Sequence, residues 1–277
     1  MPSKILLIPI LLLLGLTAYA TIMIDEDYAL WLIGPVILAA AVFIMGPQID
    51  WFWYQKHPPK LDLLEKKLLL KKVRFYPTLP TELKEKLEHR VALFNFSKIY
   101  KGMSIPSVPE DVKIMMAISA STLTLGFEDY LLEKYEQVIL YQHPFPSPQY
   151  PDQLHISEIY EEDGVFLFSI QPLMYGFVNP KQYFNIALYE LARVVNQELS
   201  TGEIKALQSY SLDDILAISG TNQTDLEKYM GLNEIDIKAV AIVQLMEFPK
   251  AVKQYAPKLF NELCAHLNYE PAWLLTD

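Results

Sequence analysis

Two long apolar runs dominate the beginning of the chain. Residues 5–24 and 28–46 contain no charged side chain, and each run is close to the roughly 20 residues that a helix needs to cross a hydrocarbon core. Only Asp25, Glu26 and Asp27 separate the two runs. The pattern therefore predicts a transmembrane hairpin within residues 1–56, with spans at about 5–24 and 28–46.

The charges around these runs bear on an alternative, a cleaved signal peptide. Lys4 precedes the first run, and Ala18-Tyr19-Ala20 has the small-x-small form of a cleavage site. Basic residues also follow the second run closely, while the loop between the runs is acidic. Basic residues stay on the cytoplasmic side. We therefore favour the uncleaved hairpin, with both termini and the following domain in the cytoplasm.

Leucines and lysines alternate at helical spacing in residues 60–72, within a basic juxtamembrane segment that we place at 57–74. One interpretation is an ordinary helix whose leucines pack on the following domain. The other is a basic amphipathic helix that docks on anionic lipid headgroups. We favour the first.

The rest of the chain, residues 75–277, is long enough for one domain with a sizeable core. Apolar positions at helical spacing predict helices at 81–100, 107–126, 182–199, 236–248 and 256–267. A strand is predicted at 137–141, and a hairpin of strands at 154–160 and 165–170 around the turn from Glu161 to Gly164. We expect an α+β fold, mostly helical with a small sheet.

Composition excludes some functions. The net charge is −10, so nucleic acid is not an expected partner. The one cysteine, Cys264, cannot form an internal disulfide, which agrees with a reducing compartment.

A degenerate motif lies in the predicted helix at 182–199, where the chain reads Tyr189-Glu190-Leu191-Ala192-Arg193. A zinc peptidase carries His-Glu-x-x-His, because imidazoles four residues apart on a helix reach the same zinc ion. Here Tyr189 and Arg193 replace both imidazoles, and Arg193 adds a positive charge that repels a metal. Glu190, the position of the general base, remains.

The five histidines do not rebuild a metal site. No two of them lie within five residues of each other, and His155 and Glu158 are expected to point to opposite faces of a strand. We therefore predict no metal and no cofactor. Glu190 and Arg193 have the i, i+3 spacing of a helical ion pair, which fits a structural pair and also a cleft that still binds a peptide.

Several stretches of the chain resemble the MtfA-like zinc peptidases, the family related to the Mlc titration factor. The resemblance covers most of residues 75–271, and the stretches that carry it are 75–80, 122–127, 139–144, 165–169, 239–241, 248–249, 259–260 and 269–271. It implies a zincin-like fold in a bacterial protein, and membrane-anchored members carry spans before the domain.

The resemblance also implies where the zinc ligands of the family fall. The two histidines correspond to Tyr189 and Arg193, and the third ligand, a glutamate, corresponds to Val243. If the register slips by one helical turn, Glu247 takes the position of that glutamate. Only Glu190 matches the family, as its catalytic base.

We therefore interpret the chain as a catalytically inactive peptidase homologue, a pseudoenzyme anchored by two spans in the bacterial inner membrane. Its expected partners are the lipid bilayer and another membrane or membrane-associated protein, for which it acts as a scaffold or accessory subunit. The alternative is an active membrane-bound metallopeptidase with an atypical metal site. A third possibility makes the hairpin itself the functional unit of a larger complex.

Overall fold

The structure is a computed structural model that describes residues 1–270 and 274–275. Pro271, which the sequence resemblance includes, lies outside the described residues. The chain divides into two compact units, Met1–Pro59 and Lys60–Asp277.

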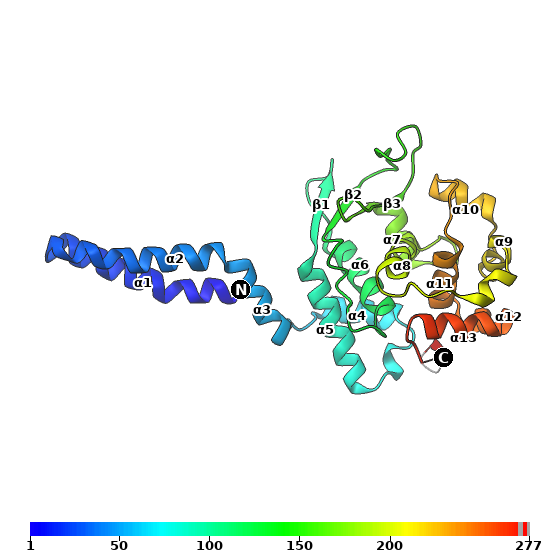
Figure 1. Cartoon of the computed structure of the whole chain (residues 1–277), viewed down its shortest axis with the longest axis horizontal. Coiled ribbons are helices and arrows are strands. Elements are labelled where there is room, and N and C mark those ends of the chain that lie inside the picture. The colour runs from blue at the N-terminus through cyan, green and yellow to red at the C-terminus, as the bar shows by residue number, and fades with distance from the viewer. Residues whose placement is uncertain (271–273, 276–277) are drawn as a thin grey trace. The chain divides into compact units, whose positions relative to one another are not determined.

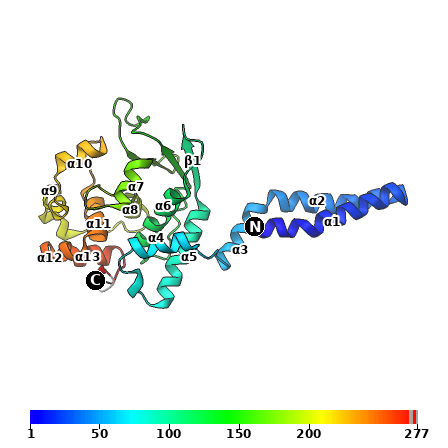
Figure 2. The same cartoon turned by 180° about the vertical axis from the view of Figure 1, so that it is seen from behind.

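The first unit is a helical hairpin (Figures 1 and 2). Its elements are α1 (Pro2–Met23), the 3-10 helix η1 (Glu26–Leu32), α2 (Ile33–Ile44) and α3 (Gly46–Lys56). Helix α1 and the continuous η1–α2 segment are both long and apolar enough to span a membrane. The first helix begins earlier than the predicted span, at Pro2, since proline is well tolerated in a first helical turn.

A buried polar contact holds the open end of the hairpin. The carboxylate of Asp50 in α3 accepts hydrogen bonds from the backbone nitrogen of Ser3, at 2.7 Å, and from its Oγ, at 2.8 Å. The first N–H groups of a helix lack partners within the helix and lie at the positive end of its dipole. Asp50 therefore caps α1 and ties its beginning to α3.

The second unit is mostly helical and contains one small sheet (Figure 1). Its elements in chain order are α4 (Leu63–Lys72), η2 (Tyr76–Thr78), α5 (Thr81–Ser97), β1 (Ile99–Met103), α6 (Glu110–Leu123), β2 (Gln137–Tyr141), β3 (Ser157–Tyr160), β4 (Val165–Ser169), α7 (Ile170–Val178), α8 (Ile186–Glu198), η3 (Lys205–Ser209), α9 (Leu212–Leu216), η4 (Ala217–Ser219), α10 (Gln223–Met230), α11 (Ile237–Glu247), α12 (Pro249–Tyr255) and α13 (Pro257–His266).

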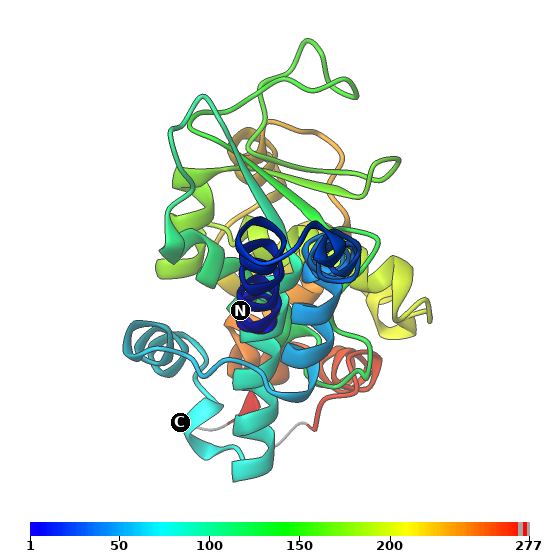
Figure 3. The same ribbon diagram turned by 90° about the vertical axis from the view of Figure 1, so that its left-hand side faces the viewer.

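The sheet is mixed and has the order β1-β2-β4-β3. Strands β1, β2 and β4 run parallel, and β3 pairs antiparallel with β4 around the predicted acidic turn. Strand β3 is thus an edge strand. The loop between β2 and β3 is the proline-rich segment, and it extends beyond the sheet (Figures 1 and 3).

Strand β4 is buried on both faces, which explains its uninterrupted apolar sequence. Phe166 and Phe168 join the main core with the helices. Val165 and Leu167 point to the other face, where Phe145 of the proline-rich loop covers them. The loop therefore completes the packing of the sheet.

The predicted fold class is confirmed, but several element boundaries differ. Strand β2 coincides with the prediction, and α6, α8, α11 and α13 fall inside the predicted helices. The helix predicted at 81–100 is wrong at its end, because α5 stops at Ser97 and β1 begins at Ile99. The backbone N–H of Ile99 donates to the carbonyl of Glu136, which starts the pairing of β1 with β2.

The leucines of α4 divide between the core and solvent. Asp62 and Glu65 form a capping box at its beginning, and Leu69 is fully buried in the core of the domain. Leu63, Leu64 and Leu70 are exposed. The expectation that the leucines of residues 60–72 pack on the domain holds for Leu61, Leu68 and Leu69 and is wrong for these three.

Candidate functional site

Helix α8 crosses the middle of the domain, between the sheet and the helices of the C-terminal part (Figure 2). Asn185 starts it, because its side chain accepts a hydrogen bond from the backbone N–H of Leu188 at 3.1 Å. Tyr189 and Glu190 are buried, while the side chain of Arg193 is 28% exposed. The degenerate motif thus lies on a packed helix with only Arg193 reaching solvent.

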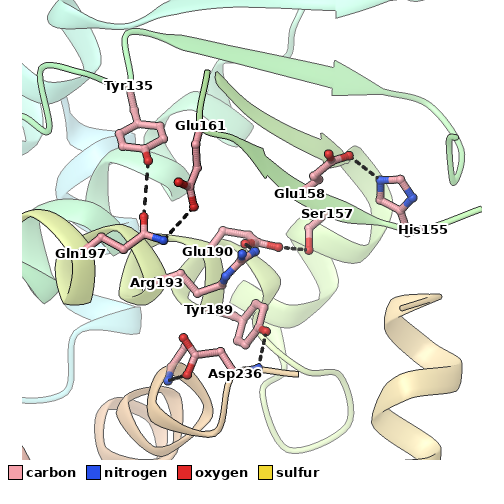
Figure 4. A network of polar contacts seen from close by, with 11 residues as sticks. Tyr135, His155, Ser157, Glu158, Glu161, Tyr189, Glu190, Arg193, Gln197 and Asp236 are labelled. Atoms are coloured by element: carbon pink, nitrogen blue, oxygen red, sulfur yellow. Dashed lines mark hydrogen bonds and ion pairs between the residues drawn. The ribbon is translucent and has the colours of Figure 1, made fainter. Parts of the chain in front are cut away.

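Both carboxylate oxygens of Glu190 are engaged (Figure 4). One accepts a hydrogen bond from Ser157 Oγ of β3 at 2.7 Å, and the other accepts one from Arg193 at 2.9 Å. The expected i, i+3 pair of Glu190 and Arg193 therefore forms. Ser157 adds a contact across to the edge strand of the sheet.

Burial decides the electrostatics of this pair. Removal from water raises the pKa of Glu190, and Arg193 and Ser157 counteract only part of that rise. Burial alone would lower the pKa of Arg193, but the attraction and hydrogen bond of Glu190, together with Tyr189 and Asp236, outweigh burial, so the pKa of the guanidinium is raised. Arg193 is therefore a fixed positive charge beside Glu190.

Tyr189 connects α8 with the beginning of α11. Its phenol oxygen accepts a hydrogen bond from the backbone nitrogen of Asp236 at 3.0 Å, and its ring packs edge-on against Phe184 at 5.6 Å between centroids. Burial raises the pKa of Tyr189, so the phenol stays protonated. One carboxylate oxygen of Asp236 caps α11 through the N–H groups of Lys238 and Ala239.

A cleft of about 510 Å³ is lined by Tyr189, Glu190, Arg193 and Asp236. Its walls come from β3, α8, α10, the segment 232–236 and the proline-rich loop, which contributes Gln149 and Tyr150. Gln197 lies at one end and donates to Glu161 at 2.8 Å (Figure 4). Most of the cleft-lining side chains are polar, so the cleft suits a polar ligand.

His155 and Glu158 correct one expectation from the sequence. Their side chains meet, with Nε2 of His155 2.8 Å from a carboxylate oxygen of Glu158, although alternation along a strand predicts opposite faces (Figure 4). The reason is that β3 begins only at Ser157, while His155 forms an isolated bridge with Phe145. The strand alternation therefore does not reach back to His155.

The second ring nitrogen of this histidine also has a neighbour. Nδ1 of His155 is 3.2 Å from the carbonyl oxygen of Gln153. The other oxygen of Glu158 is buried without a hydrogen-bond partner in the part of the chain that the structure describes.

The structure does not bring Val243 to this cleft. Val243 lies about two turns along α11 from Asp236 and lines a separate cavity, together with Glu247. Glu247 accepts a hydrogen bond from Asn185 at 2.7 Å, and burial raises its pKa. The α11 region meets Tyr189 through Asp236 instead.

Sequence reasoning missed Ser157 and Asp236 as neighbours of the motif. Both are brought in by packing of distant segments, and only the position of Asp236 at the predicted start of a helix hinted at a capping role. Among residues 1–270 and 274–275, no group of three or more His, Cys, Asp or Glu side chains is placed to hold a metal ion.

The sequence profile of the family described as glucose-regulated metallo-peptidase M90 matches residues 53–267. No curated protein sequence matches the chain. The matched range contains every side chain of the cleft described above.

Proposed function

Because the chain belongs to the family of glucose-regulated M90 metallopeptidases, we propose that it uses the peptidase fold as a membrane-tethered binding module that does not hydrolyse peptides. The match confirms the resemblance to MtfA-like peptidases drawn from the sequence. The domain is thus metallopeptidase-like, and the absence of catalysis is our proposal.

The side chains at the motif do not fit the zinc ion that the family implies. Catalytic zinc is bound by imidazole, thiolate or carboxylate groups, and three such ligands are usual. Tyr189 is a protonated phenol whose oxygen already accepts a hydrogen bond. Arg193 is a permanent cation, and it hydrogen-bonds the glutamate that would act on the zinc-bound water.

The arrangement of Glu190 carries the proposal. A general base needs a free oxygen within hydrogen-bond reach of the proton that it removes. Ser157 and Arg193 occupy both oxygens of Glu190, and the carboxylate has no exposure to solvent. The contacts favour a structural ion pair in place of a catalytic base.

The α11 region does not supply a replacement ligand set. The side chain of Val243 has no atom that can bind a metal ion. Asp236 is the residue of this region that contacts Tyr189, and it uses one carboxylate oxygen to cap α11. Even if the other oxygen of Asp236 were available, the set would contain one carboxylate and no imidazole. In the alternative register the third ligand would be Glu247, which lines a separate cavity and accepts a hydrogen bond from Asn185 at 2.7 Å, so neither register supports a zinc ion at Tyr189.

Binding remains possible because the cleft is open. Its volume of about 510 Å³ lies in the usual range for ligand pockets, and a polar segment of a partner protein fits its lining. The two apolar helices of the first unit support a membrane tether. The basic residues that flank them favour cytoplasmic termini and a cytoplasmic domain. We therefore propose a partner at the cytoplasmic face of the membrane.

Metal content and turnover test the loss of catalysis. The full chain is purified in mild detergent, its zinc is measured by mass spectrometry, and cleavage of a mixed peptide library is followed with and without a chelator. We expect no bound zinc and no chelator-sensitive cleavage. Stoichiometric zinc, with turnover that Glu190→Gln abolishes, would establish the alternative of an active peptidase with an atypical metal site.

Site-directed photocrosslinking tests the binding function. A photoreactive amino acid is placed at Asn233 on the rim of the cleft, and at the exposed Gln208 in η3 as the matched control. We expect a discrete crosslinked membrane or membrane-associated protein from position 233 and none from position 208. Equal products from both positions, or none from either, would contradict a partner bound in the cleft.

A further inference from the structure

Helix α4 presents three leucines to solvent. The exposed fractions are 89% for Leu63, 58% for Leu64 and 52% for Leu70, whereas Leu69 is fully buried against the domain. Successive residues of a helix are about 100° apart, so Leu63, Leu64 and Leu70 all lie on the half of the helix opposite to Leu69. An apolar cluster exposed in this way marks an interaction surface.

Two lysines lie on the same half of α4. Lys67 and Lys71 are exposed, and neither forms an ion pair within the part of the chain that the structure describes. Lys66, by contrast, turns toward the domain and pairs with Glu88 at 2.9 Å. The outward face of α4 is thus three leucines with two free cations, and we call it the Leu/Lys face.

Further cations continue from the end of α4. The cations Lys71, Lys72, Arg74 and Lys181 border a cavity of about 240 Å³, whose wall also includes the carboxylate of Glu247 and apolar side chains such as Phe177 and Met246. The cations of this cavity outnumber its one carboxylate. The charge around the Leu/Lys face is therefore positive over an area larger than α4 itself.

We infer that the Leu/Lys face of α4 docks on the surface of an anionic lipid bilayer. A basic helix that lies in the membrane interface buries leucines among the acyl chains and holds lysines at the anionic headgroups. A protein partner would also cover leucines, but the unpaired lysines favour a negatively charged surface. The chain as a whole has a net charge of −10, so the positive charge of the Leu/Lys face is a local feature.

The position of α4 in the chain supports the same occupant. This step rests on the proposed membrane tether. Residues 57–62 connect α3 with α4, and a fully extended segment of that length spans at most about 20 Å. A hairpin in the bilayer therefore keeps α4 within reach of the headgroups at a high effective concentration.

The test measures whether an anionic bilayer shields the Leu/Lys face from solvent. The full chain is placed in nanodiscs of phosphatidylcholine alone or of phosphatidylcholine with phosphatidylglycerol, and a fluorophore on Leu64→Cys is quenched with iodide. Cys264 can stay in place, because it is buried and burial raises the pKa of its thiol to about 11, so it reacts slowly with the label. Gln208→Cys provides the solvent-exposed control.

We expect iodide quenching at position 64 to fall several-fold in the anionic discs and to stay high in the neutral discs. Lys67→Glu with Lys71→Glu should restore full quenching, and position 208 should not respond to the lipid. Quenching that is equally high in both discs overturns the inference. Protection that is equal in both discs also overturns it, because a protein surface then covers α4.

Alkaline carbonate extraction of the same protein from liposomes separates this inference from the tether. A chain that resists extraction while position 64 stays accessible to iodide contradicts the docking alone. An extractable chain contradicts the tether, and with it the docking that rests on it. Neither outcome bears on zinc content or peptide cleavage, which test the remainder of the proposed function.

Discussion

Arg193 reaches back one turn of α8 and donates a hydrogen bond to the buried carboxylate of Glu190 at 2.9 Å. The positive charge beside Glu190 is therefore supplied by a residue of the same helix. Ser157 donates to the second oxygen from the edge strand of the sheet. The ion pair thus also joins two layers of the domain.

Removal of Arg193 should destabilise the domain. Arg193→Met leaves the charge of Glu190 buried with one hydrogen bond, which costs about 2–4 kcal/mol of unfolding free energy. Glu190→Gln in the same chain removes that charge and should recover at least half of the loss. Chemical unfolding of the two single variants and the double variant in detergent measures this coupling. Additive effects of the two substitutions would show that the pair contributes little.

Histidines at the two motif positions should create a zinc site. Tyr189→His with Arg193→His removes the cation and provides two imidazoles four residues apart on α8. Asp236 lines the same cleft as Tyr189 and Arg193, so Asp236→Asn should weaken the zinc affinity of this double variant. Calorimetric titration with zinc checks both expectations. Tyr189→Phe with Arg193→Met is the matched control, and zinc binding by that control would contradict our interpretation of the cleft.

His266 should make the domain sensitive to mild acid. Burial, with a smaller effect of Lys238, lowers the pKa of His266 from 6.5 to about 4. Because the folded chain binds this proton more weakly than the unfolded chain, the stabilisation is complete above pH 6.5 and is lost as the pH falls toward 4. The side chain is half-buried, so we expect a loss of about 1–2 kcal/mol after allowance for screening.

The measurement is thermal unfolding across that pH range. His266→Gln should remove most of the slope between pH 6.5 and 4, because it keeps a polar side chain near Asn196 and Ser200 but cannot gain the proton. An unchanged slope in this variant would assign the acid sensitivity to other groups.

Two glycines separate backbone conformation from close packing. Gly231 and Gly220 both have φ near +77°, and each ends a helix. A Cβ at Gly231 would lie 2.1 Å from the carbonyl oxygen of Leu154, whereas a Cβ at Gly220 meets nothing within 4 Å. Gly220→Ala should cost about 1–2 kcal/mol, and Gly231→Ala about 1–3 kcal/mol more. Similar losses in both variants would contradict the close approach of Leu154.

The sequence predicted those elements whose pattern is local. Helices α6, α8, α11 and α13 bury a recognisable set of apolar residues, and the turn from Glu161 to Gly164 favours the β3–β4 hairpin. Strand β1 was not predicted, because Ile99–Met103 is short and forms a strand only through parallel pairing with β2, which is distant in sequence. The end of the helix before it was misplaced for the same reason.

The candidate site follows the same division. The contact between Glu190 and Arg193 follows from spacing along one helix, and it is present. Ser157 and Asp236 reach the motif across sequence separations of 33 and 47 residues, which no periodicity reveals. The contact between His155 and Glu158 was predicted wrongly, because regular alternation was assumed for residues that precede the strand.

The positive charge beside Glu190 belongs to Arg193, which is part of the chain itself. A metal ion must be acquired from the cell, and it can be lost or exchanged for another. The positive charge beside Glu190 is instead made with the chain during translation and keeps a fixed stoichiometry. The positive charge beside Glu190 therefore does not depend on zinc supply, and chelation or metal starvation leaves it unchanged.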